Sequence, residues 1–454
     1  MYQLTVAAFS ELDLGDKRRD ERFVSIINNV TNNPGSSIPT QNDSWYDAKA
    51  TYSFYKNESV TIESLSKAIS AFGGSKISGI PKLLIAHDFC QISFNKLEQT
   101  EGLGYLAHKD GRGIFTYNSI GISTDGTPLS LLYQHSFIRP LVELGKAKNR
   151  RETPYEDKES YHWYKGFTTV NELLDEGVQK IHIADREADI FELFFASLQP
   201  NSDILLRARY NRKTEDGNHL WDELSEESNP PVITIKIPEK KGHKLVDVEV
   251  SIRFKKVTIV KPEYCKSPHE TIELTAILLQ QISPKQDWQE ETIDWRLLTS
   301  LAIETVADAL QCVQWYCYRW LIERFHYVLK SGTKIEELQL KRAEGLQKAI
   351  HLYSLAAMLI MQMVYQSRAT PDVSCEVILT KEQWIVLYIL THKTTEKPTL
   401  TPTLGEAVKW IGKLGGHLGR KSDGPPGLKV VWRGYQRLIN AQELYNIMDK
   451  NRFG

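Results

Sequence analysis

The chain has 454 residues, of which 41% are hydrophobic and 25% charged, a balance typical of a soluble globular protein with more than one domain. No apolar run approaches the ~20 residues of a membrane span, and the N-terminal residues lack the basic and apolar stretches of a signal peptide. The five cysteines are scattered and contain no Cys-x-x-Cys pair, which argues against a disulfide framework or a zinc site. We therefore expect a cytoplasmic protein without a membrane partner.

The net charge of −1 does not indicate a nucleic-acid partner, although local clusters of bases matter more than the sum. Any one cluster is more often a solvated face than a binding site, so the charge permits a nucleic-acid partner and does not prove one. The clusters are Lys17, Arg18 and Arg19; Lys146, Lys148, Arg150 and Arg151; Arg207, Arg209, Arg212 and Lys213; Lys240, Lys241 and Lys244; and Arg253, Lys255 and Lys256.

Residues 1–72 are expected to form a helical N-terminal domain, because apolar residues recur at helical spacing from Phe23 to Val30. In residues 73–368 the spacing of the apolar residues changes. Short apolar runs at 83–86, 119–122 and 181–184 predict buried strands, and helical stretches at 169–177 and 188–197 lie between and after them. This alternation predicts an α/β domain.

The α/β pattern is interrupted at about 212–300, where polar and apolar residues alternate at 232–237 and 246–254 and predict a β-rich insertion. Helical periodicity returns at 303–330 and at 346–365. Residues 369–454 contain prolines and paired glycines between amphipathic stretches, and we expect them to form a small helical C-terminal domain.

Asp88 and Asp185 each follow one of the predicted buried strands. A side chain at the carboxyl end of a strand projects from the sheet edge, where the ligands of open α/β sheets collect. Asp185 or Asp189 could instead cap the following helix, and for Asp189 this is the favoured interpretation. Asp110 and Asp125 lie among glycines and are interpreted as turn residues.

The helical stretch at 303–330 carries a polar stripe. At about 100° per residue, Tyr316, Arg319, Glu323 and Lys330 project within a sector roughly 60° wide. A phenol, a guanidinium, a carboxylate and an ammonium would then line one helix face. By themselves these residues are equally well explained as a solvated, salt-bridged surface.

The run Tyr-x-x-Arg-Trp-x-Ile-Glu-x-Phe-His-x-x-x-Lys at 316–330 resembles the signature of the IS4-type DDE transposases, in particular the Tn5-like ones. The family pattern recurs at 185–190 and 295–300. Residues 12–19 resemble the DNA-binding domain of the family, and 407–416 resemble its dimerisation region. The chain departs from the family after Asp88, where Phe89 and Cys90 replace the usual small hydroxyl residues.

The resemblance implies an RNase H-like α/β core interrupted by the β-rich insertion, between a helical DNA-binding domain and a helical dimerisation domain. It implies that Asp88, Asp185 and Glu323 hold two Mg²⁺ ions, for which Mn²⁺ can substitute, since hard cations prefer carboxylate oxygens. The implied activity is cut-and-paste transposition by strand nicking, hairpin formation and strand transfer. The implied partners are double-stranded DNA at transposon ends, target DNA and a second copy of the chain, in a bacterial cytoplasm at the nucleoid.

The resemblance also assigns DNA contacts. Trp295 matches the family position that stacks on a base flipped out of the duplex, although a tryptophan in a β-rich segment can equally be a core residue. Tyr316, Arg319 and Lys330 match positions that hold phosphates near the transposon end. Three arginines near the end of a predicted strand lie where the family places further DNA contacts: Arg207, Arg209 and Arg212.

Three other functions remain as alternatives. A metal-dependent nuclease of the same fold would cut DNA without joining it, and the three acids do not separate it from a transposase. A catalytically silent DNA-binding protein is disfavoured because Asp88, Asp185 and Glu323 are all present. A glycosidase with paired carboxylates is disfavoured because it explains neither the basic clusters nor the polar stripe.

Overall fold

The computed structural model describes residues 4–107, 111–143, 154–226, 228–238, 245–263, 265, 267–287, 289, 291–420 and 423–450. Two predicted basic clusters and one predicted turn residue therefore lie outside the described residues: Lys146, Lys148, Arg150 and Arg151; Lys240, Lys241 and Lys244; and Asp110.

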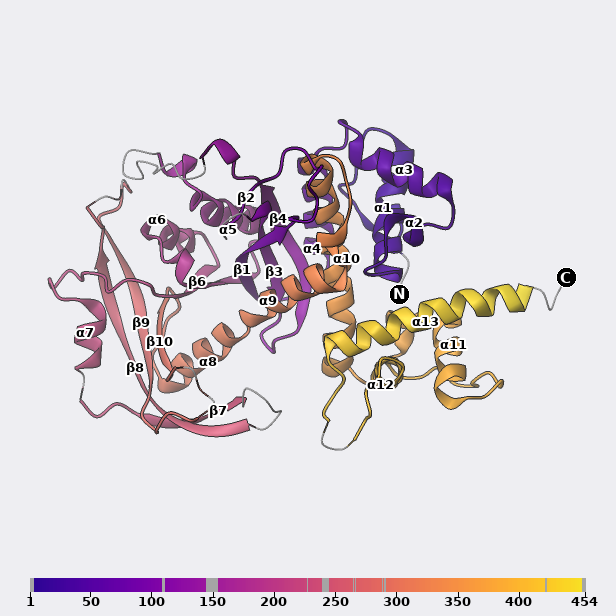
Figure 1. Cartoon of the computed structure of the whole chain (residues 1–454). Helices are drawn as coiled ribbons and strands as arrows, with labels where there is room; N and C mark the ends of the chain where they lie inside the picture. Colours follow the sequence, from indigo (N-terminus) through magenta and orange to yellow (C-terminus); the bar gives the residue numbers. More distant parts are fainter. Residues whose placement is uncertain are drawn as a thin grey trace.

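One mixed sheet of ten strands forms the centre of the protein (Figure 1). Its strands are β1 (Lys82–Ser93), β2 (Gly104–Tyr105), β3 (Arg112–Ile122), β4 (Pro128–Phe137), β5 (Gln179–Ala184), β6 (Ser202–Arg207), β7 (Val232–Pro238), β8 (Leu245–Val260), β9 (Thr271–Gln281) and β10 (Asp294–Thr299). The parallel strands β1, β5 and β6 adjoin the antiparallel strands β3 and β4, which is the arrangement of the predicted RNase H-like core. The predicted insertion widens this same sheet, because β10 pairs antiparallel with β6.

Helices cover both faces of the sheet, and its central strands are therefore continuous apolar runs. In β1, Leu84 and Ala86 face the side covered by α9 (Trp320–Tyr327) and α10 (Ala343–Ala369). The intervening residues Leu83 and Ile85 face the side of α5 (Tyr161–Leu173) and α6 (Phe191–Phe194). The alternation along β1 thus determines which side chains meet α9.

The N-terminal residues form the predicted helices, which are α1 (Lys17–Asn32), α2 (Ile38–Gln41), α3 (Trp45–Lys56) and α4 (Ile62–Ser75). The side chains of Asp16, Ser44 and Thr61 each accept a hydrogen bond from a backbone N–H in the first turn of α1, α3 and α4. The apolar residues that predicted α1 are buried, and α1 packs against α10.

The long helix α10 joins the parts of the protein, since it packs against α1, α4 and β4 and also against the C-terminal α12 (Leu404–Leu414). Within the described part of the chain, α10 alone is long and apolar enough to cross a membrane, but 78% of its most apolar window is buried inside the protein. Even Lys348 is only 1% exposed, and its ammonium donates to the Asn57 carbonyl at 2.9 Å. The helix is therefore a core helix.

The C-terminal residues form α11 (Lys381–His392), α12 and α13 (Leu428–Lys450), in agreement with the predicted helical region. α12 and α13 approach closely because glycines lie at their crossing. A Cβ on Gly434 would lie 1.7 Å from the Ile411 carbonyl oxygen, and one on Gly415 would lie 1.9 Å from that of Val430. The distal end of α13 extends away from the rest of the protein (Figure 1). The domain boundaries at 72 and 368 stay a prediction.

Candidate active site

Asp88 and Asp185 are brought together by the parallel pairing of β1 with β5. The last pair in register is Ala86 with Ile183, and the two aspartates lie two residues further along their strands. Because side chains alternate along a strand, both carboxylates point to the face that α9 covers. Asp88 does not end its strand as the sequence suggested, since β1 continues beside β3 to Ser93. It lies beside the point where β5 stops.

Asp185 also begins the short 3-10 turn Arg186–Ala188. Its carboxylate accepts a hydrogen bond from the Glu187 backbone N–H at 2.9 Å. The helix-capping interpretation of Asp185 is therefore correct. It does not exclude a ligand role, because a carboxylate has a second oxygen with further lone pairs.

Glu323 reaches the same place from α9. The Arg319 guanidinium lies between the acids: its Nη2 donates to Glu323 Oε1 at 2.7 Å, and its Nη1 is 3.6 Å from Asp88 Oδ2. The side chains are partly shielded from solvent, with exposed fractions of 17% for Asp88 and 33% for Glu323. Arg319 thus links Asp88 of β1 to Glu323 of α9, and the register of β1 with β5 places Asp185 beside Asp88.

The convergence changes the acidity of Asp88. Its pKa is raised to about 7, chiefly by burial and next by the negative charge of Asp185, while Arg319 opposes the shift. The negative charges of Asp185 and Glu323 thus act on the buried Asp88, and the Arg319 guanidinium partly compensates them. This is the electrostatic situation in which a cation binds strongly.

A divalent metal ion fits this donor set by its chemistry, because all three side chains offer carboxylate oxygens. Among the described residues, no group of three His, Cys, Asp or Glu side chains is already spaced to hold an ion. Asp88 and Glu323 are held apart by the Arg319 guanidinium that lies between them. The three acids therefore suit a hard cation once Arg319 moves from its position between them.

The raised pKa of Asp88 predicts how the stability of the metal-free protein depends on pH. A carboxyl that binds its proton more tightly in the folded state lowers stability as pH rises from about 3.8 to about 7, and the loss persists above that pH. We expect the free energy of unfolding of Asp88→Asn to be about 1–3 kcal/mol higher than that of the wild type near pH 8. This difference should disappear near pH 4. Urea denaturation with a chelator at several pH values measures the difference. Parallel pH profiles would contradict the assigned pKa.

The predicted polar stripe does not lie on one regular helix. The helix α8 (Val306–Cys317) ends before a turn at Tyr318 and Arg319, and a π-helical turn, Val328–Gly332, contains Lys330. The backbone winds differently at both points, yet Arg319 still donates to Glu323 and lies beside Tyr316. Arg319 reaches the acids, Tyr316 is 6% exposed, and Lys330 lies near the buried Cys90 thiol. Tyr316, Arg319 and Glu323 are thus neighbours as the stripe predicted, although the helix is not regular, and Lys330 lies on the π-helical turn.

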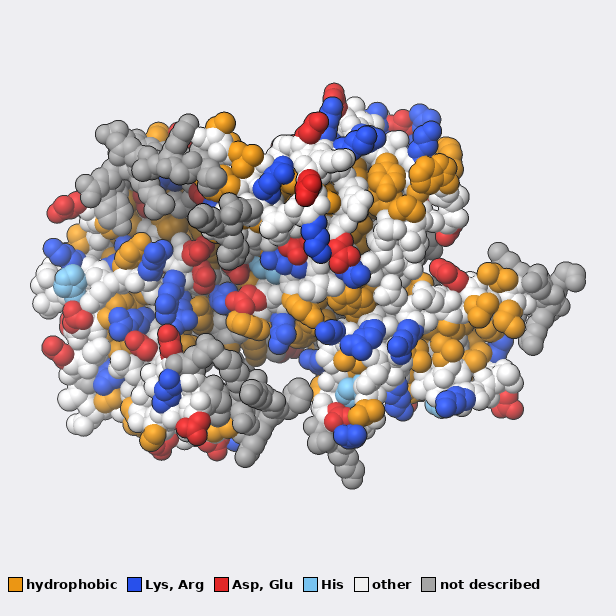
Figure 2. Space-filling view, viewed as in Figure 1, with side chains coloured by type: hydrophobic (Ala, Val, Ile, Leu, Met, Phe, Trp, Pro, Cys, Tyr) orange, Lys and Arg blue, Asp and Glu red, His pale blue; other side chains and the backbone are white. Residues whose placement is uncertain are grey.

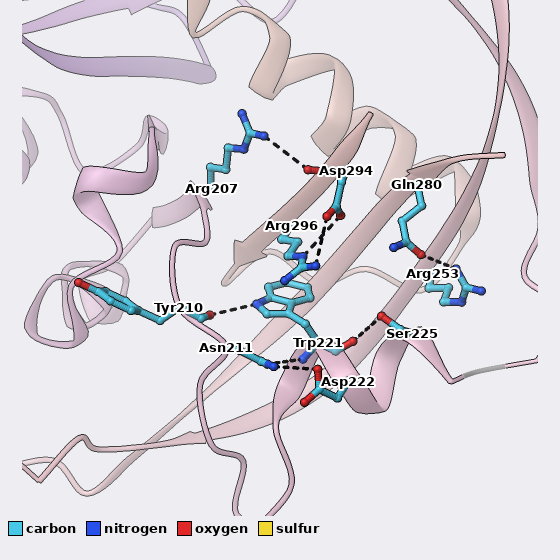
Figure 3. Close-up of polar contacts among 10 residues, drawn as sticks. All are labelled: Arg207, Tyr210, Asn211, Trp221, Asp222, Ser225, Arg253, Gln280, Asp294 and Arg296. Carbon is cyan, nitrogen blue, oxygen red and sulfur yellow. Dashed lines mark hydrogen bonds and ion pairs between the residues drawn. The ribbon is translucent and has the colours of Figure 1, made fainter. Parts of the chain in front are cut away.

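Tyr316 packs against Trp295. Trp295 lies in β10, is partly buried and meets the Tyr316 ring edge to face, with centroids 5.6 Å apart. Arg207 ends the neighbouring strand β6 and donates to the Asp294 carbonyl at 3.4 Å (Figure 3). Burial lowers the pKa of Arg207, and the positive charge of the exposed Arg186 adds to this shift. The sequence did not single out Arg186, although it directly follows Asp185.

Arg212 does not face a DNA partner, which corrects the sequence prediction. Its side chain is 5% exposed, and it donates to Asp189 Oδ1 from Nε at 2.9 Å and from Nη2 at 2.6 Å. Asp189 also accepts from the backbone N–H groups of Arg209 and Tyr210, at 2.7 and 2.9 Å. The side chain of Asp189 therefore holds the loop after β6 and does not cap the start of α6, whose N-cap residue is Ile190. Arg209 is exposed beside the Tyr210 ring.

The comparisons with known proteins give three matches along the chain. Residues 3–60 match the family described as "Transposase DNA-binding", residues 146–359 match "Transposase DDE domain" and residues 355–445 match "Transposase Tn5 dimerisation domain". The chain belongs to the IS4-type, Tn5-like DDE transposases. Its DDE domain identifies this transposase as an enzyme. Asp88 lies outside the three matched ranges, so its assignment to the site rests on the sheet register and on Arg319.

One solved structure in the comparison is titled "Cryo-EM structure of piggyBac transposase synaptic complex with hairpin DNA (SNHP)". Its sequence is 12% identical, the TM-score is 0.34, and the match covers 85% of this chain. This chain spans 65% of the length of that one. A similarity at this level carries no argument about the Tn5-like transposase.

The buried pair of Arg212 and Asp189 leads to a prediction about this transposase. Removal of one partner from a buried ion pair leaves an uncompensated charge, so Arg212→Ala should lower the free energy of unfolding by about 3–5 kcal/mol. The exposed Arg209→Ala is the matched control, with a change within about 0.5 kcal/mol. Thermal and urea denaturation compare the two. Equal stability of both variants would show that the pair is not formed.

Proposed function

We propose that this transposase catalyses cut-and-paste DNA transposition by nicking transposon ends, closing hairpins on them and joining them to target DNA. The observation that carries the proposal is the convergence of Asp88, Asp185 and Glu323 at the point where β5 ends beneath α9. Its partners would be double-stranded DNA at transposon ends and target DNA. It would act in the cytoplasm at the nucleoid.

Asp88, Asp185 and Glu323 would hold two Mg²⁺ ions, with Mn²⁺ as a substitute, and they supply the oxygen ligands that such ions prefer. When bound, these ions supply activation of the attacking oxygen and stabilisation of the leaving oxygen at the phosphate. The attacking group would be water for the first nick and the freed 3′-hydroxyl for hairpin closure. Water would then reopen the hairpin and regenerate the 3′-hydroxyl, which would attack target DNA. The nuclease alternative differs only in lacking these later steps.

The basic residues around the acids would orient the DNA backbone. Arg319 pairs with Asp88 and Glu323 in the absence of DNA, and a phosphate would be its partner in the complex. Lys330 and the exposed Arg209 would contribute further phosphate contacts. Arg207 would do so from the end of β6. Trp295 would stack on a base removed from the duplex, with Tyr316 as its support.

The proposed function is tested by incubating the purified protein with Mg²⁺ and DNA that carries the ends of its own element. Denaturing gels separate nicked strands, hairpins and joined products. Transposition predicts all three species in that order. Nicked products without hairpins or joined strands would identify the nuclease alternative, and the absence of any cleavage would exclude both.

The distal end of α13 would bind a second copy of the chain. Leu444, Ile447 and Met448 occur at i, i+3 and i+4, and they are 60%, 60% and 58% exposed. Figure 2 shows hydrophobic side chains at this end of the helix. Since a surface stripe of this kind is typical of a helix that packs against a partner, a dimer of two DNA-bound copies would cover it.

Replacement of Leu444, Ile447 and Met448 together by serine should abolish paired-end complexes while binding of a single end persists. The apolar α12 segment at 407–416 is a poorer target, because its residues Ala407, Val408 and Ile411 are buried within the chain. Native gels with labelled transposon ends measure both complexes. Leu400→Ser is the control, since Leu400 is 81% exposed but lies outside α13. Paired-end complexes formed by the triple variant would refute this interface.

A further inference from the structure

A buried polar network lies directly beside the three acids. Asp88 on β1 pairs in register with Asn118 on β3, and Asn118 pairs in register with Gln134 on β4. Directly opposed residues of antiparallel strands share a face. The three side chains therefore form a row across three strands, on the face that α9 and α10 cover.

Both polar atoms of the Asn118 amide make hydrogen bonds. Its Nδ2 donates to Thr116 Oγ1 and to His326 Nε2, both at 3.0 Å, and its Oδ1 accepts from Gln134 Nε2 at 2.7 Å. Asn118 has no exposed surface, and His326 is 8% exposed. Because each bond has a fixed direction, this amide defines a position for His326 that apolar contacts alone would leave variable.

The network connects the sheet to two helices. His326 lies in α9, three residues after Glu323 and hence one turn further along the same helix. Burial lowers the pKa of His326 to about 3, so the ring is neutral and Nε2 can accept from the Asn118 amide. Gln134 also donates to Ser354 Oγ of α10 at 2.7 Å. The helix that carries Glu323 is thus held to the strand beside Asp88.

We infer that Asn118 and His326 are a positioning pair that sets the separation of Glu323 from Asp88 for metal binding. The inference rests on the proposed function, because it takes the acids to be the ligands. In the absence of metal, Arg319 links Asp88 to Glu323, but a long side chain that must later release them cannot define their separation. The Asn118–His326 bond is buried and does not involve the carboxylates, so it can persist when an ion binds.

Substitutions at His326 test the inference in the full chain bound to transposon-end DNA, with Mn²⁺ as the probe. His326→Leu removes the acceptor, whereas His326→Gln keeps an oxygen near the position of Nε2. A group that hydrogen-bonds a metal ligand directly typically contributes about 10–100-fold to metal affinity. His326 acts on Glu323 only through the helix, so we expect the lower end of this range, about tenfold, for His326→Leu. His326→Gln should stay close to the wild type. Electron paramagnetic resonance of free Mn²⁺ gives the affinity, and nicking rates give the Mn²⁺ concentration for half-maximal activity.

Two controls separate positioning from general stability and from the proposed function. His351→Leu removes another buried histidine, which lies on α10 and contacts Ser136 at 3.4 Å, and it should lower the melting temperature without changing Mn²⁺ affinity. Asp185→Ala should abolish Mn²⁺ binding, and its failure to do so would overturn the proposed function itself. His326→Asn, whose shorter side chain does not reach Asn118, replaces His326→Leu if that variant does not fold.

The inference is overturned if His326→Leu and His326→Asn bind Mn²⁺ as the wild type does while Asp185→Ala does not. It is also overturned if His326→Gln is as impaired as His326→Leu, or if His351→Leu shifts the affinity equally. Any of these results would make the network a stabilising feature of the core alone.

Discussion

Replacement of Asp88, Asp185 or Glu323 by alanine is expected to slow DNA nicking by a factor on the order of a thousand or more, with little change in binding of transposon ends. The acids come from β1, the end of β5 and α9, so in the proposed site each would contribute ligands that the other two cannot supply. Affinity for DNA comes mainly from Lys and Arg contacts with phosphates, and these contacts remain. Burial chiefly, and next the negative charge of Asp185, raise the pKa of Asp88, so loss of a carboxylate removes an unfavourable charge and these variants should fold.

Single-turnover nicking assays and gel-shift titrations measure the two properties separately. Asp203→Ala is a suitable control, because Asp203 is a partly buried acid on β6 that contacts Ser300 and Gln179 and takes no part in the proposed site. A variant of Asp88, Asp185 or Glu323 that nicks at nearly the wild-type rate would not have lost a ligand.

Trp295→Ala is expected to slow hairpin formation by roughly ten- to a hundredfold, while the first nick proceeds nearly unchanged. The nick attacks an almost undistorted duplex, whereas the hairpin requires a sharply bent end with one base outside the stack. Base–aromatic stacking contributes ~1–3 kcal/mol, which sets this range. Trp295 is partly buried in a T-shaped contact with Tyr316, so one part of its ring is packed and another is exposed.

Trp221→Ala is the matched control for Trp295. Trp221 is 1% exposed, and its indole N–H donates to the Tyr210 carbonyl at 3.1 Å (Figure 3). Its loss should lower the free energy of unfolding by ~3–5 kcal/mol and slow every step together. Time courses of nicked and hairpin species, with a thermal melt of each variant, distinguish the two outcomes. Equal loss of both steps with a lowered melting temperature would make Trp295 a core residue.

The sequence predicted the strands and helices where periodicity follows burial. The apolar runs at 83–86 and 181–184 are adjacent parallel strands, and the alternation at 232–237 lies in β7. The predicted helix at 169–177 instead ends at Leu173, and 188–197 forms a turn and two short helical segments. Local propensity sets such boundaries only weakly, because tertiary packing of α5 and α6 determines where each segment ends.

The acids were predictable as residue types, but their arrangement was not. A regular helix was expected to carry Tyr316, Arg319, Glu323 and Lys330, but the helix is interrupted by a turn at Tyr318 and Arg319 and ends in a π-helical turn that contains Lys330. Hydrogen-bond shifts of this kind have no marker in residue periodicity. Arg212 likewise lies in a basic cluster by sequence, yet it is buried against Asp189, a contact between residues 23 positions apart.

The most direct test of the central claim is an anomalous diffraction map of this transposase bound to transposon-end DNA and Mn²⁺. The account predicts anomalous peaks between the carboxylates of Asp88, Asp185 and Glu323, with the Arg319 guanidinium moved from its place beside Asp88 to a DNA phosphate. Peaks held by other residues in a complex that still nicks DNA, or Arg319 unmoved between vacant acids, would contradict it.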